Sequence, residues 1–588
     1  MSFQGRVTLA SAAAVAVAVA IASSVTYVVV RNALHDRINH SLSTLATAFV
    51  QAEHGVPAHP PHGKDAFGVR FGTATVEATP TGSVKHTTNG DEELYADKSG
   101  TYTKCLKQDR PGVVNPKAFK KFREALGSAD GKTQGTADFE VKGLLGAGRK
   151  LNGPLGAFAL TLAGADSQHF GDPLVPPAPT LASPEYATEL VENYWASLLR
   201  DVPFTEYATN PTAIAAAKEL TQLGATYAGP KNAKGVVTPD LLFRGGLTLT
   251  PKKGKPTTYF AGETIGPYIS QLAIRPTHLG AQPLDQMLDT LAAGVDYMTD
   301  LNSWAAVQDG ASPPPPTPGT QRQFLHDGRG LGAYTHVDEL YQAYLIAYLV
   351  LNTLGIGSNP DSPYRKFKNQ QPFGTFGGPD IAPTLGAVAR AAINAVWYQK
   401  WIVHLRHRPE SGGGIVELIK TGQGNTIDGK VHPIVLNSAA LQQSYQKYGS
   451  YLLAQAFPEG SPAHPAYPTG HGTVAGACIT ALKFFFDGDA TIPNPMVPTA
   501  DGLSLVPYTG PDSGKLTVNG ELHKLAHNIS FGHGIHAGIH WRSDTDYSVL
   551  LGEAVALTFL QDQAWTYKEN FAVRLTKLDG SKVTIKNR

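Results

Sequence analysis

The sequence predicts a mainly α-helical protein, built as helix bundles with one small β-hairpin at its C-terminal end. Long runs with apolar residues at helical spacing dominate the chain. Some of these runs are apolar on nearly every face, which is typical of helices at the centre of a large core. Strand-like alternation on either side of Asp579-Gly580 predicts the hairpin.

The expected helices have recognisable starts and ends. Ser183 followed by Pro184 marks the first turn of one helix. Thr335 is expected to cap a second, long helix that Gly355 ends. Pro383 is expected to start a third, which is apolar nearly all round and therefore central. The predicted helices span residues 117–126, 184–199, 213–223, 335–354, 383–405, 471–486 and 543–563, with another from about residue 521.

Composition excludes two broad classes of protein. The formal net charge is +1, and 16% of the residues are charged, below the roughly 25% usual in soluble proteins. No basic block with interleaved aromatic residues is present, which argues against a nucleic-acid partner. The chain has two cysteines, Cys105 and Cys478, too few for a disulfide framework. We expect Cys478 to be a buried packing residue.

The N-terminal residues differ in kind from the rest. Residues 7–30 are almost wholly apolar and long enough to span a bilayer. Residues 1–48 are therefore expected to be a membrane anchor or a signal peptide, with a buried core helix as the third alternative. The first two alternatives predict a protein that is membrane-anchored or secreted, outside the cytoplasm. Residues 49–93 are expected to form a polar linker, and residues 94–588 one helical domain.

The chemistry centres on the stretch HPAYPTGHGTVAGACIT, from His464 to Thr480. Small residues recur there at near-helical spacing, which predicts a helix packed closely against a neighbour. The first N–H groups of that helix, near Gly470 and His471, form a site for an oxyanion. Thr469 adds a hydroxyl group, and His471 adds a proton donor.

Four other side chains can complete an oxyanion cage. Lys400 supplies a point charge, and Arg408 supplies a planar fork of donors. His540 is followed four residues later by Asp544, a spacing that suits an imidazole held by a carboxylate. Taken singly, each residue also fits an ordinary role, such as a surface charge, a helix cap or a core histidine.

The order of these motifs resembles a known superfamily. K-x7-RP, then [ST]GH, then H-x3-D is similar to the vanadium-dependent haloperoxidases and the type 2 phosphatidic acid phosphatases. Longer stretches, AFPEGSPAHPAYPTGHGTVAGACIT, ETIGPYISQ, DYMTDLNSWAAVQD and GELHKLAHNI, resemble the red-algal vanadium bromoperoxidases and their bacterial relatives. The resemblance covers roughly residues 90–588 and implies a helical-bundle haloperoxidase-like fold.

The resemblance also implies a cofactor and a reaction. The cofactor is vanadate, with His540 as its sole protein ligand and His471 as the acid–base residue. The residues that match those holding the vanadate oxygens are Lys400, Arg408, Thr469 and Gly470. The implied substrates are hydrogen peroxide, a halide, with bromide preferred, and a small organic acceptor. A homo-oligomer is also implied.

Two further positions match the family's halide pocket. They are His464, seven residues before His471, and Trp397, three residues before Lys400. The histidine is of the bromoperoxidase type. The tryptophan departs from the arginine of the red-algal enzymes, and simple core packing is its alternative role.

One departure affects the cage itself. The family has an arginine six residues before the metal-binding histidine, where this chain has Gly534. His533 and His536 are the neighbouring side chains able to replace part of that charge. We therefore expect weak vanadate binding that Gly534→Arg would strengthen. The alternatives are a phosphatase, in which His540 is the nucleophile, and an inactive relative that binds an oxyanion or nothing.

Overall fold

The computed structural model describes residues 84–128, 139–161, 163–249, 257–424 and 430–587. The predicted anchor or signal segment, residues 1–48, and the predicted linker up to residue 83 lie outside this range. Within the described residues, no helix has the length and apolar character needed to cross a membrane. Residues 84–93 pack on the domain, since the backbone N–H of Val84 donates to the Gln168 carbonyl and that of Leu181 to the buried Asp91 carboxylate.

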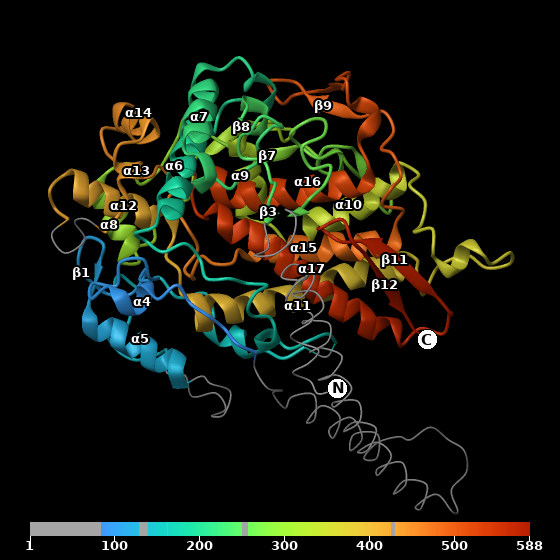
Figure 1. The fold of residues 1–588 in the computed structure, drawn as a ribbon, viewed down its shortest axis with the longest axis horizontal. Helices are drawn as coiled ribbons and strands as arrows, with labels where there is room; N and C mark the ends of the chain where they lie inside the picture. Colours follow the sequence, from blue (N-terminus) through green and yellow to red (C-terminus); the bar gives the residue numbers. More distant parts are fainter. Residues whose placement is uncertain (1–83, 129–138, 162, 250–256, 425–429, 588) are drawn as a thin grey trace, which may run out of the picture.

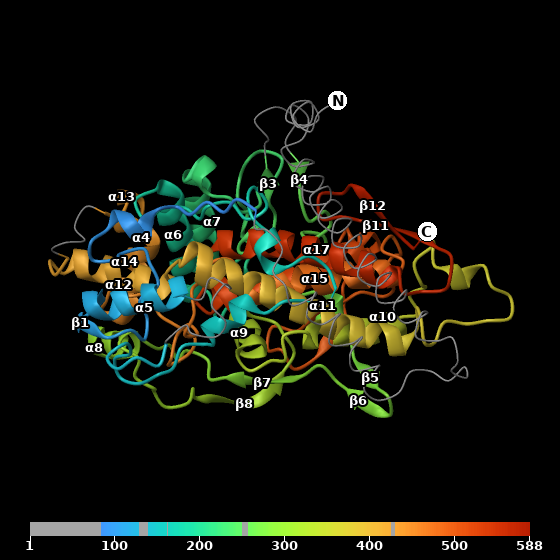
Figure 2. The same cartoon turned by 90° about the horizontal axis from the view of Figure 1, so that it is seen from below.

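Three long helices form the centre of the molecule. They are α11 (Gly378–Tyr398), α15 (Gly470–Phe485) and α17 (Arg542–Ala564). Figures 1 and 2 show them running side by side along the long axis, and each contacts the other two. The largest apolar core lies among them. The mainly α, helical-bundle class predicted from the sequence is confirmed.

The remaining helices surround this centre. They are α4 (Asp91–Leu94), α5 (Pro116–Ser128), α6 (Pro184–Leu198), α7 (Pro211–Gln222), α8 (Leu301–Gln308), α9 (Gly328–His336), α10 (Gln342–Thr353), α12 (Pro409–Lys420), α13 (Pro433–Leu436), α14 (Ala439–Tyr448) and α16 (Val518–Phe531). The predicted cap of α6 is confirmed, because the Ser183 side chain accepts a hydrogen bond from the Tyr186 N–H. Cys105 and Cys478 are buried and not bonded to each other, as expected.

The strands form six separate antiparallel pairs in the described part of the chain. The pairs are β1 (Gln108–Arg110) with β2 (Val113–Val114), β3 (Thr248–Leu249) with β4 (Thr257–Thr258), β5 (Thr277–Leu279) with β6 (Gln282–Leu284), β7 (Leu288–Leu291) with β8 (Pro318–Gln323), β9 (Met496–Pro498) with β10 (Leu505–Pro507), and β11 (Ala572–Thr576) with β12 (Lys582–Lys586). The last pair is the predicted C-terminal hairpin, which turns through Gly580 at φ 80°.

The helix predicted from Thr335 to residue 354 is wrong, because the chain breaks there. α9 ends at His336 and α10 begins at Gln342. Thr335 caps neither helix, since its hydroxyl donates to the Leu331 and Gly332 carbonyls inside α9. The break is held open by tertiary contacts of two side chains, which local propensity cannot reveal: His336 bonds Glu459, and Asp338 bonds His471.

Pro383 does not start α11, contrary to the prediction. The helix begins at Gly378, so the proline lies inside it. The extra first turn is fixed by Asp380, which accepts from the Phe376 N–H at 2.7 Å and from the Tyr567 hydroxyl of the segment after α17. Pro383 is the sixth residue of α11, beyond the first four N–H groups that lack helical partners, so it leaves the carbonyl of Pro379 without its helical donor.

The close approach of α15 and α17 is made by glycines, as the small-residue pattern predicted. A methyl group at Gly476 would collide with the Val549 carbonyl oxygen of α17. A methyl group at Gly552 would collide in turn with the Thr473 carbonyl oxygen of α15. This contact places the N-terminal ends of the two helices, and hence His471 and His540, in one region.

We predict that Gly476→Ala destabilises the protein by about 1–3 kcal/mol or more, because backbone atoms of α17 must move to make room. The measurement is the midpoint of urea unfolding. Gly386→Ala is the control: it is a helical glycine of α11 with no atom within 4 Å of an added methyl group. It should be neutral or stabilising, since alanine favours a helix by roughly 0.5–1 kcal/mol over glycine. Equal effects of the two substitutions would contradict the proposed role of Gly476.

Candidate active site

The floor of the site is the start of α15. Thr469 is the N-cap residue, yet its side chain caps nothing. Its Oγ1 is buried and has no hydrogen-bond partner among the described residues. The first N–H groups of α15, at Gly470 and His471, have no carbonyl partner within the helix. The helix start and the unpartnered Thr469 hydroxyl, which the sequence predicts to bind an oxyanion, therefore lie together.

Two cations reach this floor from the segment that follows α11. Lys400 lies on a π-helical turn, η8 (Gln399–His404), and donates to the Pro465 and Ala466 carbonyls at 2.9 and 2.6 Å. Arg408 lies at the start of α12 and donates to the His464 and Ile539 carbonyls. Their side chains are fully buried, and neither forms an ion pair with a carboxylate in the described part of the chain.

The environment of these two cations is unfavourable without an anion. Burial, and next the charge of Arg408, hold the pKa of Lys400 well below its usual value. Burial also lowers the pKa of Arg408 to about 10. Burying like charges together is costly unless an opposite charge compensates them.

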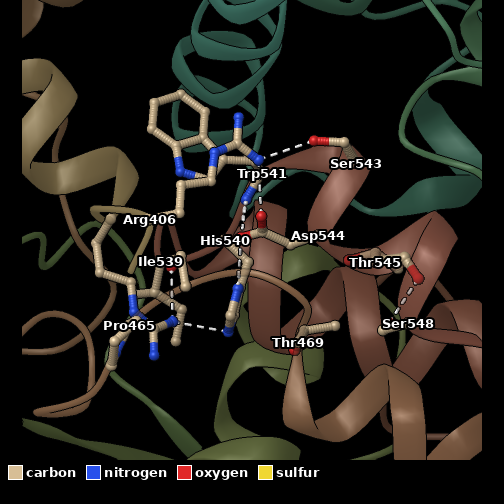
Figure 3. Close-up of polar contacts among 12 residues, drawn as sticks. Arg406, Pro465, Thr469, Ile539, His540, Trp541, Ser543, Asp544, Thr545 and Ser548 are labelled. Atoms are coloured by element: carbon tan, nitrogen blue, oxygen red, sulfur yellow. Dashed lines mark hydrogen bonds and ion pairs between the residues drawn. The ribbon is translucent and has the colours of Figure 1, made fainter. Parts of the chain in front are cut away.

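His540 faces the cations with a defined tautomer. Its Nδ1 lies 2.8 Å from Oδ2 of Asp544, which accepts only, and its Nε2 lies 2.7 Å from Nη1 of Arg408, which donates only. Nδ1 therefore carries the proton, and the Nε2 lone pair accepts a hydrogen bond from Arg408. In Figure 3 the His540 ring extends from Asp544 towards the region where Thr469 lies. The predicted His540–Asp544 pair is confirmed.

The Asp544 carboxylate is itself held by a network that the sequence did not reveal. Arg406 donates to Oδ1 of Asp544 at 2.7 Å and to the Ser543 hydroxyl at 2.8 Å. Its other nitrogen donates to Glu189 of α6 at 2.9 Å. Figure 3 shows Ser543 and Asp544 of this network above the His540 ring. Arg406 lies two residues before Arg408 in the segment LRHRP, so the sequence could have indicated it as a further site residue. Its partner Glu189 is 217 residues away, and nothing in the sequence indicates the pairing.

His471 lies on the first turn of α15 and also has a carboxylate partner. Its Nε2 is 3.0 Å from Oδ1 of Asp338, in the break between α9 and α10. The ring of His533 stacks on it with centroids 3.8 Å apart. Asp338 was missed because it falls in a stretch that was interpreted as continuous helix.

The two residues predicted for the halide pocket are in contact. The rings of Trp397 and His464 lie 4.7 Å apart, and Arg408 donates to Nδ1 of His464 at 3.0 Å. The Trp397 indole N–H donates to the Gly153 carbonyl, beside the short helix η1 (Pro154–Phe158). Trp397 therefore combines a packing role with a position beside the site.

Comparison with known proteins identifies the family. A family model described as the VCPO second helical-bundle domain matches residues 382–567, which include all the cage residues named above. A vanadium-dependent bromoperoxidase of Ascophyllum nodosum is 33% identical, over 87% of this chain and 90% of the relative. That of Corallina pilulifera is 32% identical, over 90% of this chain and 100% of the relative. The chain belongs to the vanadium-dependent haloperoxidase family.

The fold agrees with this assignment. The solved homohexameric second vanadate-dependent bromoperoxidase of Ascophyllum nodosum superposes with a TM-score of 0.78. It is 26% identical in sequence, and the match covers 91% of this chain and 93% of that structure. This family member is therefore an enzyme of the haloperoxidase kind.

The chemistry of the described residues fits a tetrahedral oxyanion such as vanadate better than a bare metal ion. No group of three or more His, Cys, Asp or Glu side chains in the described part of the chain could hold a metal ion. The cage instead offers two unpaired cations, a helix start, an unpartnered hydroxyl group and one imidazole lone pair. Such a set holds a tetrahedral anion by charge and hydrogen bonds, with room for one direct bond.

The space at Gly534 argues against the expected gain in vanadate binding from Gly534→Arg. Gly534 lies on the second π-helical turn of the site, η11 (Gly532–His536). A Cβ atom there would lie 2.9 Å from Cβ of His540 and 3.6 Å from the Thr545 hydroxyl. The position backs directly onto His540, so a side chain at residue 534 would displace the imidazole it was expected to assist.

We predict that Gly534→Ala and Gly534→Arg both weaken binding of a tetrahedral oxyanion by about tenfold or more, the value of one lost hydrogen bond to a charged group. The measurement is calorimetric titration with phosphate. Gly386→Ala, which adds a methyl group in open space on α11, is the control and should bind normally. Tighter phosphate binding by Gly534→Arg would contradict this prediction.

Proposed function

We propose that the protein is a vanadate-dependent bromoperoxidase. It oxidises bromide with hydrogen peroxide to a hypobromous-acid equivalent, which brominates small organic acceptors. The observation that carries the proposal is the pair of buried cations, Lys400 and Arg408, beside an imidazole whose lone pair faces them. The names of the relatives, which are vanadium-dependent bromoperoxidases, support the choice of cofactor and halide.

The cage residues divide the work of holding vanadate. His540 would bind vanadium through Nε2, since Asp544 fixes the proton on Nδ1. The vanadate oxygens would be held by Lys400, Arg408, the Thr469 hydroxyl and the Gly470 N–H. When bound, vanadate supplies a Lewis acid that activates peroxide without changing its own oxidation state.

His471 would move protons at the edge of this cage. Asp338 holds Nε2 at 3.0 Å, so Nδ1 is the nitrogen that would take a proton from incoming peroxide and return one to the leaving oxygen. In the net reaction bromide loses two electrons, the peroxide O–O bond breaks, and one proton is consumed to give hypobromous acid and water.

One assay tests this function against its rivals. The purified protein, with and without added vanadate, is supplied with peroxide, bromide and a phenol-type acceptor, and in parallel with a phosphate ester. Bromination that requires vanadate is the expected result. Ester hydrolysis without bromination would favour a phosphatase, and neither reaction would favour an inactive relative.

The first variants tested should be the two histidines, which we predict to be inequivalent. His540→Ala should lose bound vanadium, because it deletes the only protein–metal bond. His471→Ala should retain vanadium and lose most turnover, since acid–base help is typically worth about 10²–10⁴-fold. Elemental analysis of vanadium in both purified variants is the measurement. Equal retention of vanadium by the two would refute these roles.

The second test concerns the halide. His464 lies between the Arg408 guanidinium and the Trp397 ring, so a halide beside the cage would meet it. We predict that His464→Phe changes the ratio of bromide to chloride oxidation, with little change in vanadate affinity. The two rates are measured at saturating peroxide. A constant ratio would show that His464 serves only packing.

The last part of the proposal concerns the oligomeric state. The structural neighbour is homohexameric. We propose that this chain likewise forms a homo-oligomer, and sedimentation or light scattering of the purified protein measures its size.

A further inference from the structure

A π-helical turn, η11, lies between α16 and α17 beside the cage. π-Helical turns contain one residue more than an α-turn and are frequent at functional sites. Here the turn directs Gly534 onto the back of His540. The neighbouring His533 is turned towards the site instead, with its ring 3.8 Å from that of His471 and 5.7 Å from that of His540.

The ring of His533 lacks a hydrogen bond at one of its nitrogens among the described residues. Its ring is 7% exposed, and its Nδ1 is buried without a hydrogen-bond partner among the described residues. A buried polar atom of this kind costs free energy unless something bonds it. The Nδ1 of His536, on the same turn, is also buried without a partner among the described residues, but its Nε2 bonds the Tyr268 hydroxyl at 3.1 Å and its ring packs among aromatic rings away from the cage histidines.

An imidazole at the place of His533 does not need a charge to bind an anion. A neutral imidazole has one N–H donor and no charge. It therefore adds a hydrogen bond to an anion already compensated by Lys400 and Arg408, without adding a third buried cation.

We propose that His533 is a cofactor-binding residue, which donates a hydrogen bond to an oxygen of the bound vanadate. The proposal rests on the proposed function for the identity of the anion. The geometry applies equally to phosphate, which has the same tetrahedral shape and provides an independent probe.

The test compares equilibrium binding of vanadate and of phosphate in variants of the full-length protein. His533→Phe keeps the stack on His471 and removes the donor; it should weaken binding of both anions by about tenfold to a hundredfold, the range for a hydrogen bond to a charged group. His533→Gln restores a neutral N–H donor and should recover most of the loss. His536→Phe, on the same turn but packed against the rings of Phe204 and Phe243, is the matched control and should bind both anions normally.

Three outcomes would overturn the role of His533: unchanged binding in His533→Phe, no recovery in His533→Gln, or an equal loss in His536→Phe. Failure of the proposed function gives a different pattern. A parent protein that binds phosphate but neither binds vanadate nor brominates would refute the bromoperoxidase, while the phosphate affinities would still decide the role of His533. A parent protein that binds neither anion would refute both.

Discussion

The site is built around two buried positive charges that have no carboxylate partner among the residues the structure describes. Lys400 and Arg408 are compensated by main-chain carbonyls, which stabilise a cation only in part. Both bond carbonyl groups in the segment just before α15, whose helix dipole is also positive at that end: Lys400 bonds those of Pro465 and Ala466, and Arg408 that of His464. Three positive features in one buried place are tolerable when an anion completes them. The site is therefore unfavourable by itself and becomes favourable on binding, which is the behaviour expected of an oxyanion cage.

Two neighbouring arginines differ from Lys400 and Arg408, because each of them is paired with a carboxylate. Arg406 is buried as deeply as Arg408, but it pairs with Glu189 and Asp544. Arg542 similarly pairs with Glu192. These paired cations hold the scaffold: they join α6 to the N-terminal end of α17 and fix the carboxylate that orients His540. Paired charges thus form an outer layer, and unpaired charges the inner layer that meets the ligand.

Two deviations from regular α-helix bring the inner layer together. Lys400 lies on η8 and His533 on η11, both π-helical turns next to long regular helices. The glycine contact between α15 and α17 then sets the separation of their N-terminal ends. Because that contact involves backbone atoms, it cannot relax by side-chain rotation. The positions of His471 and His540 consequently depend on residues such as Gly476 that touch neither histidine.

The sequence by itself determined the helical class, the C-terminal hairpin and most of the cage. Lys400, Arg408, Thr469, His471, His540 and Asp544 belong to short motifs whose chemistry can be read locally, and the structure brings them together. Three features were decided only by the tertiary structure. They are the break between α9 and α10 that places Asp338 beside His471, the ion pair of Arg406 with Glu189, and the position of His533, rather than residue 534, beside His471. The physical reason is the same in each case. These features depend on contacts between segments far apart in the chain, or on one extra residue in a helical turn, and neither leaves a periodic signal in the sequence.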